Sequence, residues 1–274
     1  MIGLSPTELA QLGTQRGDIP FLPDEQSWQR FRAQLVEKSA KRNHDCFDPS
    51  LAAYTPGETL GLLDEPRIAA WLNHVPDFTV PEDCVGAILV PCAASKPWRD
   101  HKNVNKSRLY SAYNQLLDEM EAGQRPKWYF LTVSEPLGLV PQDRWGDFPP
   151  YDNPGLFKDD FLRTGLVKSD WTKTFLGARH RLPFDQAAFE VCIERLGTQI
   201  GAFLAKQNKP IVSFVDDAVL TTHGAMLDVA LQQGGKVLRL QKRAAARQNP
   251  FEHISRALER FSPAPAPRLG RRKI

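Results

Sequence analysis

Two short apolar runs separated by one amphipathic helix place the strongest constraint on how this chain folds. The first run covers residues 85–90 (Val-Gly-Ala-Ile-Leu-Val) and the second covers 128–133 (Trp-Tyr-Phe-Leu-Thr-Val). Between them, residues 107–121 carry apolar side chains at the spacing of one helix face. Parallel strands need a crossover connection of about this length. The pattern therefore predicts a β-α-β unit with a buried parallel sheet.

The second half of the chain continues this alternation. We predict a third strand at 210–215 and a fourth at 236–240, with helices at 185–206 and 218–233. A glycine pair follows the second of these helices and is typical of a helix C-terminus. The sequence thus predicts an α/β fold, in which a three-layer domain has a mostly parallel four-stranded sheet flanked by helices.

The regions around this core differ from it in pattern. An amphipathic helix is predicted at 24–41, a turn at 56–57 (Pro-Gly) and a short helix at 65–75. Residues 134–184 show no clear element but are rich in proline, glycine and aromatic residues, which favours a functional loop. We therefore expect a helical N-terminal cap (1–80), an α/β core (81–245) whose long active-site loop is 134–184, and a basic C-terminal helix and tail (246–274).

Composition argues against several classes of protein. No apolar run approaches the roughly 20 residues that span a bilayer, and the N-terminus lacks the pattern of a signal peptide. The sequence also lacks a G-x-G-x-x-G motif and a P-loop. We expect a cytoplasmic protein with no membrane partner, no cofactor and no metal. Disulfides and a zinc cage are not expected because no C-x-x-C spacing joins the four cysteines, Cys46, Cys84, Cys92 and Cys192.

The C-terminal segment is strongly basic. Residues 236–274 hold eleven Lys and Arg against two Glu, a net charge of +9, so the preceding residues carry about −6. Such asymmetry favours an anionic partner, and nucleic acid is the natural candidate. A solvated, partly disordered tail explains the same composition. The side chains that we expect to contact nucleic acid are Arg243, Arg247, Arg271 and Arg272.

Candidate reactive groups follow the first two predicted strands. Cys92 and Lys96 lie four residues apart, and an ammonium group beside a thiol favours its reactive form. The alternative is a small buried cysteine and a surface lysine. Asp152 is a candidate acid or base, or else an ordinary Asx turn. Because parallel strands end at one edge of a sheet, we predict one pocket, with catalytic roles for Cys92, Lys96 and Asp152 and substrate-binding roles for Ser95, Trp98, Ser134, Gly138, Tyr151 and Asp216.

Other polar groups in these loops carry weaker signals. Glu135 places a carboxylate beside a turn. Asp216 and Asp217 end the third predicted strand, where capping of the next helix is the alternative role. A lone histidine is more often structural than catalytic. The histidines that can titrate, none of them at metal-ligand spacing, are His101, His180 and His223.

Three motifs, in this order along residues 85–155, resemble the core domain of the archaeosine synthase family, which is related to the tRNA-guanine transglycosylases. The sequence departs from the family pattern in two ways: a tryptophan stands at position 98 where the family has tyrosine, and the serine expected shortly after it is replaced by Asp100 or absent. The motifs are Pro91-Cys92-x-x-x-Lys96-Pro97-Trp98, Ser134-x-Pro136-Leu137-Gly138-x-Val140-Pro141 and Tyr151-Asp152-x-Pro154.

The resemblance implies an enzyme that acts on 7-cyano-7-deazaguanine in DNA or tRNA. In that family a lysine amine adds to the nitrile and gives an amidine, so a small amine such as lysine is an implied partner. By position, Cys92, Lys96, Ser134 and Asp152 would form the site.

The residues themselves leave the mechanism and the function class open. Cys92 either adds to the nitrile, giving a thioimidate that an amine resolves, or only packs while the site orients amine and base. One alternative for the whole protein is a non-catalytic nucleic-acid-binding protein with a nucleotide pocket. Another is a glycosidase or base-exchange enzyme that uses Asp152 or Asp216 as its carboxylate.

Overall fold

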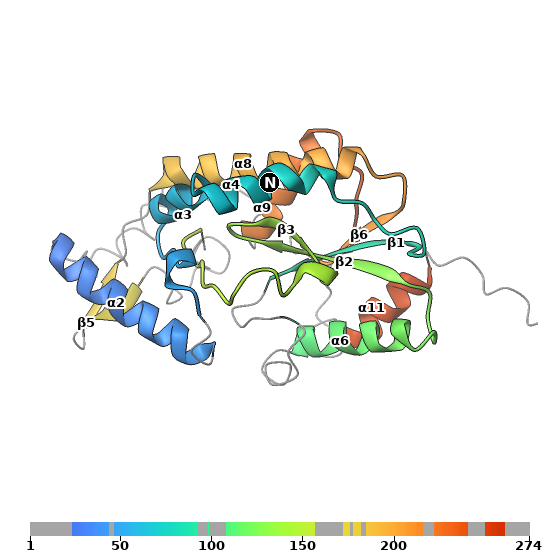
Figure 1. Cartoon of the computed structure of the whole chain (residues 1–274), viewed down its shortest axis with the longest axis horizontal. Coiled ribbons are helices and arrows are strands. Elements are labelled where there is room, and N and C mark those ends of the chain that lie inside the picture. The colour runs from blue at the N-terminus through green and yellow to red at the C-terminus, as the bar shows by residue number, and fades with distance from the viewer. Residues whose placement is uncertain are drawn as a thin grey trace, which may run out of the picture.

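A computed structural model describes residues 24–43, 47–92, 98, 108–156, 172–175, 178–181, 185–215, 222–240 and 250–260. Over these ranges the chain is an α/β protein with a mixed five-stranded sheet between two layers of helices (Figure 1). None of the helices within these ranges is both long and apolar enough to cross a membrane.

The sheet confirms the predicted parallel core and adds one strand to it. Its order is β3-β2-β1-β6-β7. Four strands run parallel, as predicted, while β3 pairs antiparallel with β2. The prediction of four strands is therefore wrong by one edge strand. The strands are β1 (Gly86–Pro91), β2 (Trp128–Ser134), β3 (Gly138–Pro141), β6 (Ile211–Ser213) and β7 (Leu238–Arg239).

Strand β3 lies in the segment that the sequence predicted to be a loop. Residues 135–137 form a tight turn, and Gly138 then has φ of +67°, a conformation that glycine adopts at little cost. The hairpin pairs Ser134 with Gly138 and Leu131 with Pro141. Proline is tolerated in an edge strand, because one side of that strand makes no ladder hydrogen bonds. The same predicted loop also contains a separate antiparallel pair, β4 (Thr172–Phe175) and β5 (Ala178–Arg181).

The helices begin and end close to their predicted positions. Asp24 and Asp185 each accept a hydrogen bond from a backbone N–H of the first turn that follows, as N-cap residues do. The turn expected at 56–57 is wrong, because Thr55 caps a helix there and proline is favoured at the first helical position. The helices are α2 (Glu25–Arg42), α3 (Pro56–Leu63), α4 (Pro66–His74), α6 (Arg108–Glu121), α8 (Gln186–Ala205), α9 (Thr222–Gln232) and α11 (Pro250–Glu259), with short 3-10 helices η1 (Pro49–Leu51), η2 (Val75–Asp77) and η3 (Gln142–Arg144).

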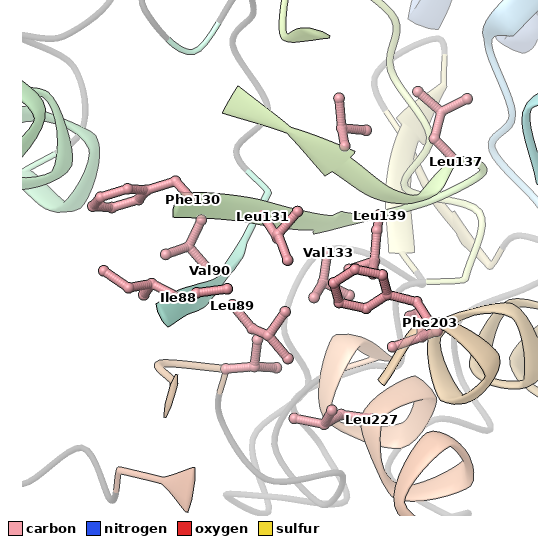
Figure 2. Packing of buried hydrophobic residues seen from close by; sticks show 14 of the residues in the cluster. Ile88, Leu89, Val90, Phe130, Leu131, Val133, Leu137, Leu139, Phe203 and Leu227 are labelled. Carbon is pink, nitrogen blue, oxygen red and sulfur yellow. The ribbon is translucent and has the colours of Figure 1, made fainter. Parts of the chain in front are cut away.

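Both faces of the sheet are covered. Helices α3, α4, α8 and α9 lie on one side, and α6 and α11 lie on the other (Figure 1). Leu131 and Val133 of β2 project toward Phe203 of α8, whereas Phe130 projects to the opposite side (Figure 2). There its ring centroid lies 5.7 Å from that of Tyr113 in α6. Continuous apolar strands such as β2 are expected where helices cover a parallel sheet on both faces.

The described part of the predicted N-terminal cap consists of two differently packed parts. Buried residues of α3 and α4, such as Leu63 and Ile68, belong to the main hydrophobic core. Helix α2 instead packs through Phe31 and, with Phe47 and Tyr54, forms smaller clusters of its own. It lies at one end of the molecule in Figure 1. Contacts between α2 and the rest of the chain therefore depend largely on the residues around 47–58 and 152.

Candidate active site

A thiol, a carboxylate and an imidazole lie together after three neighbouring strands of the sheet, β2, β1 and β6. Cys92 directly follows β1, and Glu135 directly follows β2. His223 is the second residue of α9, which follows β6, the strand on the other side of β1. All three residues therefore lie at the carboxyl ends of parallel strands, where α/β sheets bind ligands.

The three side chains are in direct contact. Nε2 of His223 lies 3.3 Å from Sγ of Cys92 and 3.0 Å from Oε2 of Glu135. The sulfur lies 3.9 Å from the same carboxylate oxygen. Glu135 is buried, at 7% exposure, and the side chain of His223 is 15% exposed. Groups this close and this poorly hydrated interact far more strongly than the same groups at a protein surface.

The charges in this cluster favour a protonated imidazole. Burial by itself lowers the pKa of His223, because the charged ring loses hydration. The negative charges of Glu135 and Cys92, and hydrogen bonds to both, outweigh burial and raise the pKa of His223 well above its ordinary value. The protonated form of His223 is therefore favoured, and its Nε2–H faces both the carboxylate oxygen and the sulfur.

Ser134 and Tyr151 form a pair of hydroxyl groups beside this cluster. Their hydroxyl oxygens lie 2.7 Å apart, and both residues are buried. Burial, together with the nearby charges of Cys92 and Glu135, raises the pKa of Tyr151 well above its ordinary value. The phenol therefore stays neutral and retains a proton that it can donate. The backbone N–H of Cys92 also donates to Val133, next to Ser134, at 2.9 Å.

Trp98 belongs to an aromatic group that includes Tyr151. Its ring stacks on Tyr110 at 6.4 Å and meets Trp145 and Tyr151 edge-on at 5.9 and 6.4 Å. The side-chain amide of Asn114 donates to the carbonyl of Trp98 at 3.0 Å. A cavity of about 10 Å³ lies among these rings, room for about one water molecule. In this structure Trp98 therefore packs against other rings, and the predicted contact with substrate stays a prediction.

Asp152 has partners outside the cluster of Cys92, Glu135 and His223. One of its carboxylate oxygens accepts a hydrogen bond from the hydroxyl of Ser39 in α2 at 2.5 Å. The same hydroxyl lies 3.0 Å from the phenol oxygen of Tyr54. These contacts attach residue 152 to the N-terminal helix, and the predicted catalytic role of Asp152 stays a prediction.

The remaining predicted residues are either structural or lie outside the described ranges. Gly138 begins β3, and a Cβ atom built on it would lie 3.4 Å from Leu72 and 4.0 Å from Leu196. Its position thus suits the β2–β3 turn, and its predicted contact with substrate stays a prediction. Outside the described residues lie Ser95, Lys96, Asp216, Arg243, Arg247, Arg271 and Arg272, together with His101, whereas His180 is a residue of β5.

Sequence reasoning noted Glu135 and His223 but did not assign them to the site. The signal for Glu135 was its position directly after a strand. The signal for His223 was its position near the start of the helix after the third predicted strand. Neither signal shows which strands are neighbours, and only the order β2-β1-β6 brings both residues to Cys92.

Comparison of the chain with protein-family models, with curated proteins and with solved structures found no match. The chemistry of the site is therefore argued from its own geometry. A thiol with an adjacent imidazole is suited to nucleophilic catalysis, because the ring can exchange protons while the sulfur forms a covalent bond. The donor atoms of Cys92, Glu135 and His223 also lie within 4.8 Å of one another, which is close enough to hold one metal ion.

Proposed function

We propose that the protein adds an amine to the nitrile of 7-cyano-7-deazaguanine in DNA or tRNA, with Cys92 as the nucleophile. The observation that supports this most directly is the 3.3 Å contact between Sγ of Cys92 and Nε2 of His223. This pair combines a nucleophile with a proton donor, and a nitrile, which is a weak electrophile, needs both. The three motifs that resemble the archaeosine synthase core supply the expectation about the substrate.

In the first step the thiolate of Cys92 forms a C–S bond to the nitrile carbon. One π bond of the nitrile breaks, and its electron pair moves to the nitrogen. That nitrogen takes the proton from Nε2 of His223, which leaves a thioimidate and a neutral imidazole. Glu135, 3.0 Å from the same ring nitrogen, holds the imidazolium in position before the transfer.

In the second step an amine adds to the carbon of the thioimidate. The neutral ring of His223 accepts the proton that the amine nitrogen loses. The C–S bond then breaks, and its electron pair returns to the sulfur of Cys92. The products are an amidine and the starting thiolate-imidazolium pair, so the cycle consumes neither oxidant nor reductant.

The charge of the C-terminal segment supports a nucleic acid as the carrier of the base. Residues 236–274 carry a net charge of +9. Phosphate contacts by Lys and Arg provide most of the affinity of such segments for nucleic acids, and this affinity falls steeply with salt. Binding of the substrate oligonucleotide is therefore expected to weaken by orders of magnitude between low and physiological salt.

The test is to trap the covalent intermediate. The full chain is incubated with an oligonucleotide that contains 7-cyano-7-deazaguanine, without an amine, and intact-mass spectrometry detects the adduct. Cys92→Ala is expected to abolish the adduct, whereas Cys192→Ala, which removes a buried thiol elsewhere, is expected to retain it. Equal turnover by wild type and Cys92→Ala would rule out the covalent route. Unchanged nucleosides in digested DNA and tRNA from producing cells would rule out the reaction itself.

A further inference from the structure

We propose that Cys92, Glu135 and His223 form a binding site for a single zinc ion. Tetrahedral zinc sites have metal–ligand distances of about 2.0–2.3 Å, which places neighbouring ligand atoms about 3.3–3.6 Å apart. The three donor atoms here are separated by 3.0, 3.3 and 3.9 Å. The centre of that triangle lies about 2.0 Å from each donor atom, close to an ordinary zinc–ligand distance. An ion therefore fits after shifts of a few tenths of an ångström.

The chemistry of the donors selects the metal. A thiolate, an imidazole nitrogen and one carboxylate oxygen form a mixed ligand set that suits Zn²⁺, whereas Mg²⁺ and Ca²⁺ prefer sites made of oxygen atoms alone. Three protein ligands leave the fourth tetrahedral position open, as in zinc sites that exchange ligands. The ligands lie 43, 88 and 131 residues apart in sequence, so the site cannot be recognised from a short sequence motif.

The zinc site and the covalent reaction use the same atoms and therefore exclude each other. A bound ion takes one lone pair of Sγ in Cys92 and the lone pair of Nε2 in His223. The sulfur is then a weaker nucleophile toward a nitrile, and the ring has no proton on Nε2 to donate. Zinc is thus expected to inhibit the proposed reaction reversibly, but the site itself does not depend on that reaction.

The direct test uses Co²⁺, which binds zinc sites and reports its ligands by absorbance. The full chain, first stripped with a chelator, is titrated with Co²⁺ and then with Zn²⁺. We expect one equivalent of Co²⁺ to give a thiolate-to-metal charge-transfer band together with the visible bands of tetrahedral cobalt. Zn²⁺ is then expected to displace the Co²⁺ and remove both.

Variants locate the site. Cys92→Ala is expected to lose the charge-transfer band. Glu135→Gln and His223→Ala are expected to weaken Co²⁺ binding at least about tenfold, since even residues that only support a metal ligand are worth that much. Cys192→Ala, the control thiol, is expected to keep the full spectrum. Thermal unfolding of each variant without metal identifies any that is misfolded, and Cys92→Ser then replaces Cys92→Ala.

The outcomes separate this proposal from the proposed reaction. An unchanged cobalt spectrum in Cys92→Ala, or no stoichiometric binding by wild type, overturns the zinc site. Covalent adduct formation is measured separately in excess chelator. An adduct without cobalt binding rejects the zinc site alone, and cobalt binding without an adduct rejects the covalent reaction alone.

Discussion

Two buried clusters each contain one carboxylate, yet their surroundings differ. The reactive cluster consists of Cys92, Glu135 and His223, and the hydroxyl cluster consists of Ser39, Tyr54 and Asp152. Both carboxylate residues are 7% exposed, so burial does not distinguish them. The partners do. A thiol can form a covalent bond to a substrate, and an imidazole can transfer a proton at neutral pH. Hydroxyl groups only hold a carboxylate in place.

The hydroxyl cluster has a defined direction of hydrogen bonding. Ser39 has one hydroxyl proton, which it donates to Asp152 at 2.5 Å. The phenol of Tyr54 must therefore donate to the oxygen of Ser39, 3.0 Å away. Backbone N–H groups of Asp48 and Ala53 also donate to the carbonyls of residues 150 and 152. Together these bonds attach α2 and its following segment to the chain beside the candidate active site.

The largest expected effect is the loss of turnover in His223→Gln. Glutamine retains a hydrogen bond to Glu135 but cannot deliver a proton, and positioned proton donors contribute about 10²–10⁴-fold to a rate. Single-turnover measurements on a nitrile-containing oligonucleotide should show a fall of that size. Ser39→Ala, the control in the hydroxyl cluster, should turn over substrate at the wild-type rate. Equal loss in both variants would mean that the two clusters act as one.

A stability change should identify the hydroxyl cluster. Asp152→Ala leaves the buried hydroxyl of Ser39 without its acceptor, which costs about 1–3 kcal/mol of unfolding free energy. Urea unfolding followed by circular dichroism measures this loss. Asp152→Asn, which keeps an oxygen acceptor, should lose less. Wild-type stability in Asp152→Ala would show that the contact with α2 contributes nothing to the fold.

The fall in unfolding free energy at alkaline pH should depend on Tyr54. Burial and the charge of Asp152 raise the pKa of Tyr54 to about 12. An unfolded tyrosine titrates near pH 10, so the folded state favours the neutral phenol. This contribution is complete below about pH 10 and is lost as the pH rises toward 12. In Tyr54→Phe the fall in unfolding free energy over that window should be smaller by on the order of 1–2 kcal/mol. The same fall in both proteins would contradict the raised pKa of Tyr54.

The sequence predicted those features whose signals are local. Helical spacing and the apolar runs placed most helices and four strands within a few residues. The position of Cys92 after β1 followed in the same way. The contact between Cys92 and His223 could not be predicted, because it joins residues 131 positions apart and depends on β6 pairing with β1. Strand β3 was missed because Pro141 within it and Pro136 just before it are typical of a loop.

The smallest expected effect concerns coupling between the clusters. Within the hydroxyl cluster, Ser39→Ala and Asp152→Ala remove two ends of one hydrogen bond, so their stability losses should be coupled by at least about 0.5 kcal/mol. Ser39→Ala and Cys92→Ala should instead add within about 0.3–0.5 kcal/mol, as independent sites do. Double-mutant cycles by urea unfolding measure both values. Stronger coupling between Ser39 and Cys92 would mean that α2 acts on the candidate active site through Asp152 and Tyr151, which are adjacent in the chain.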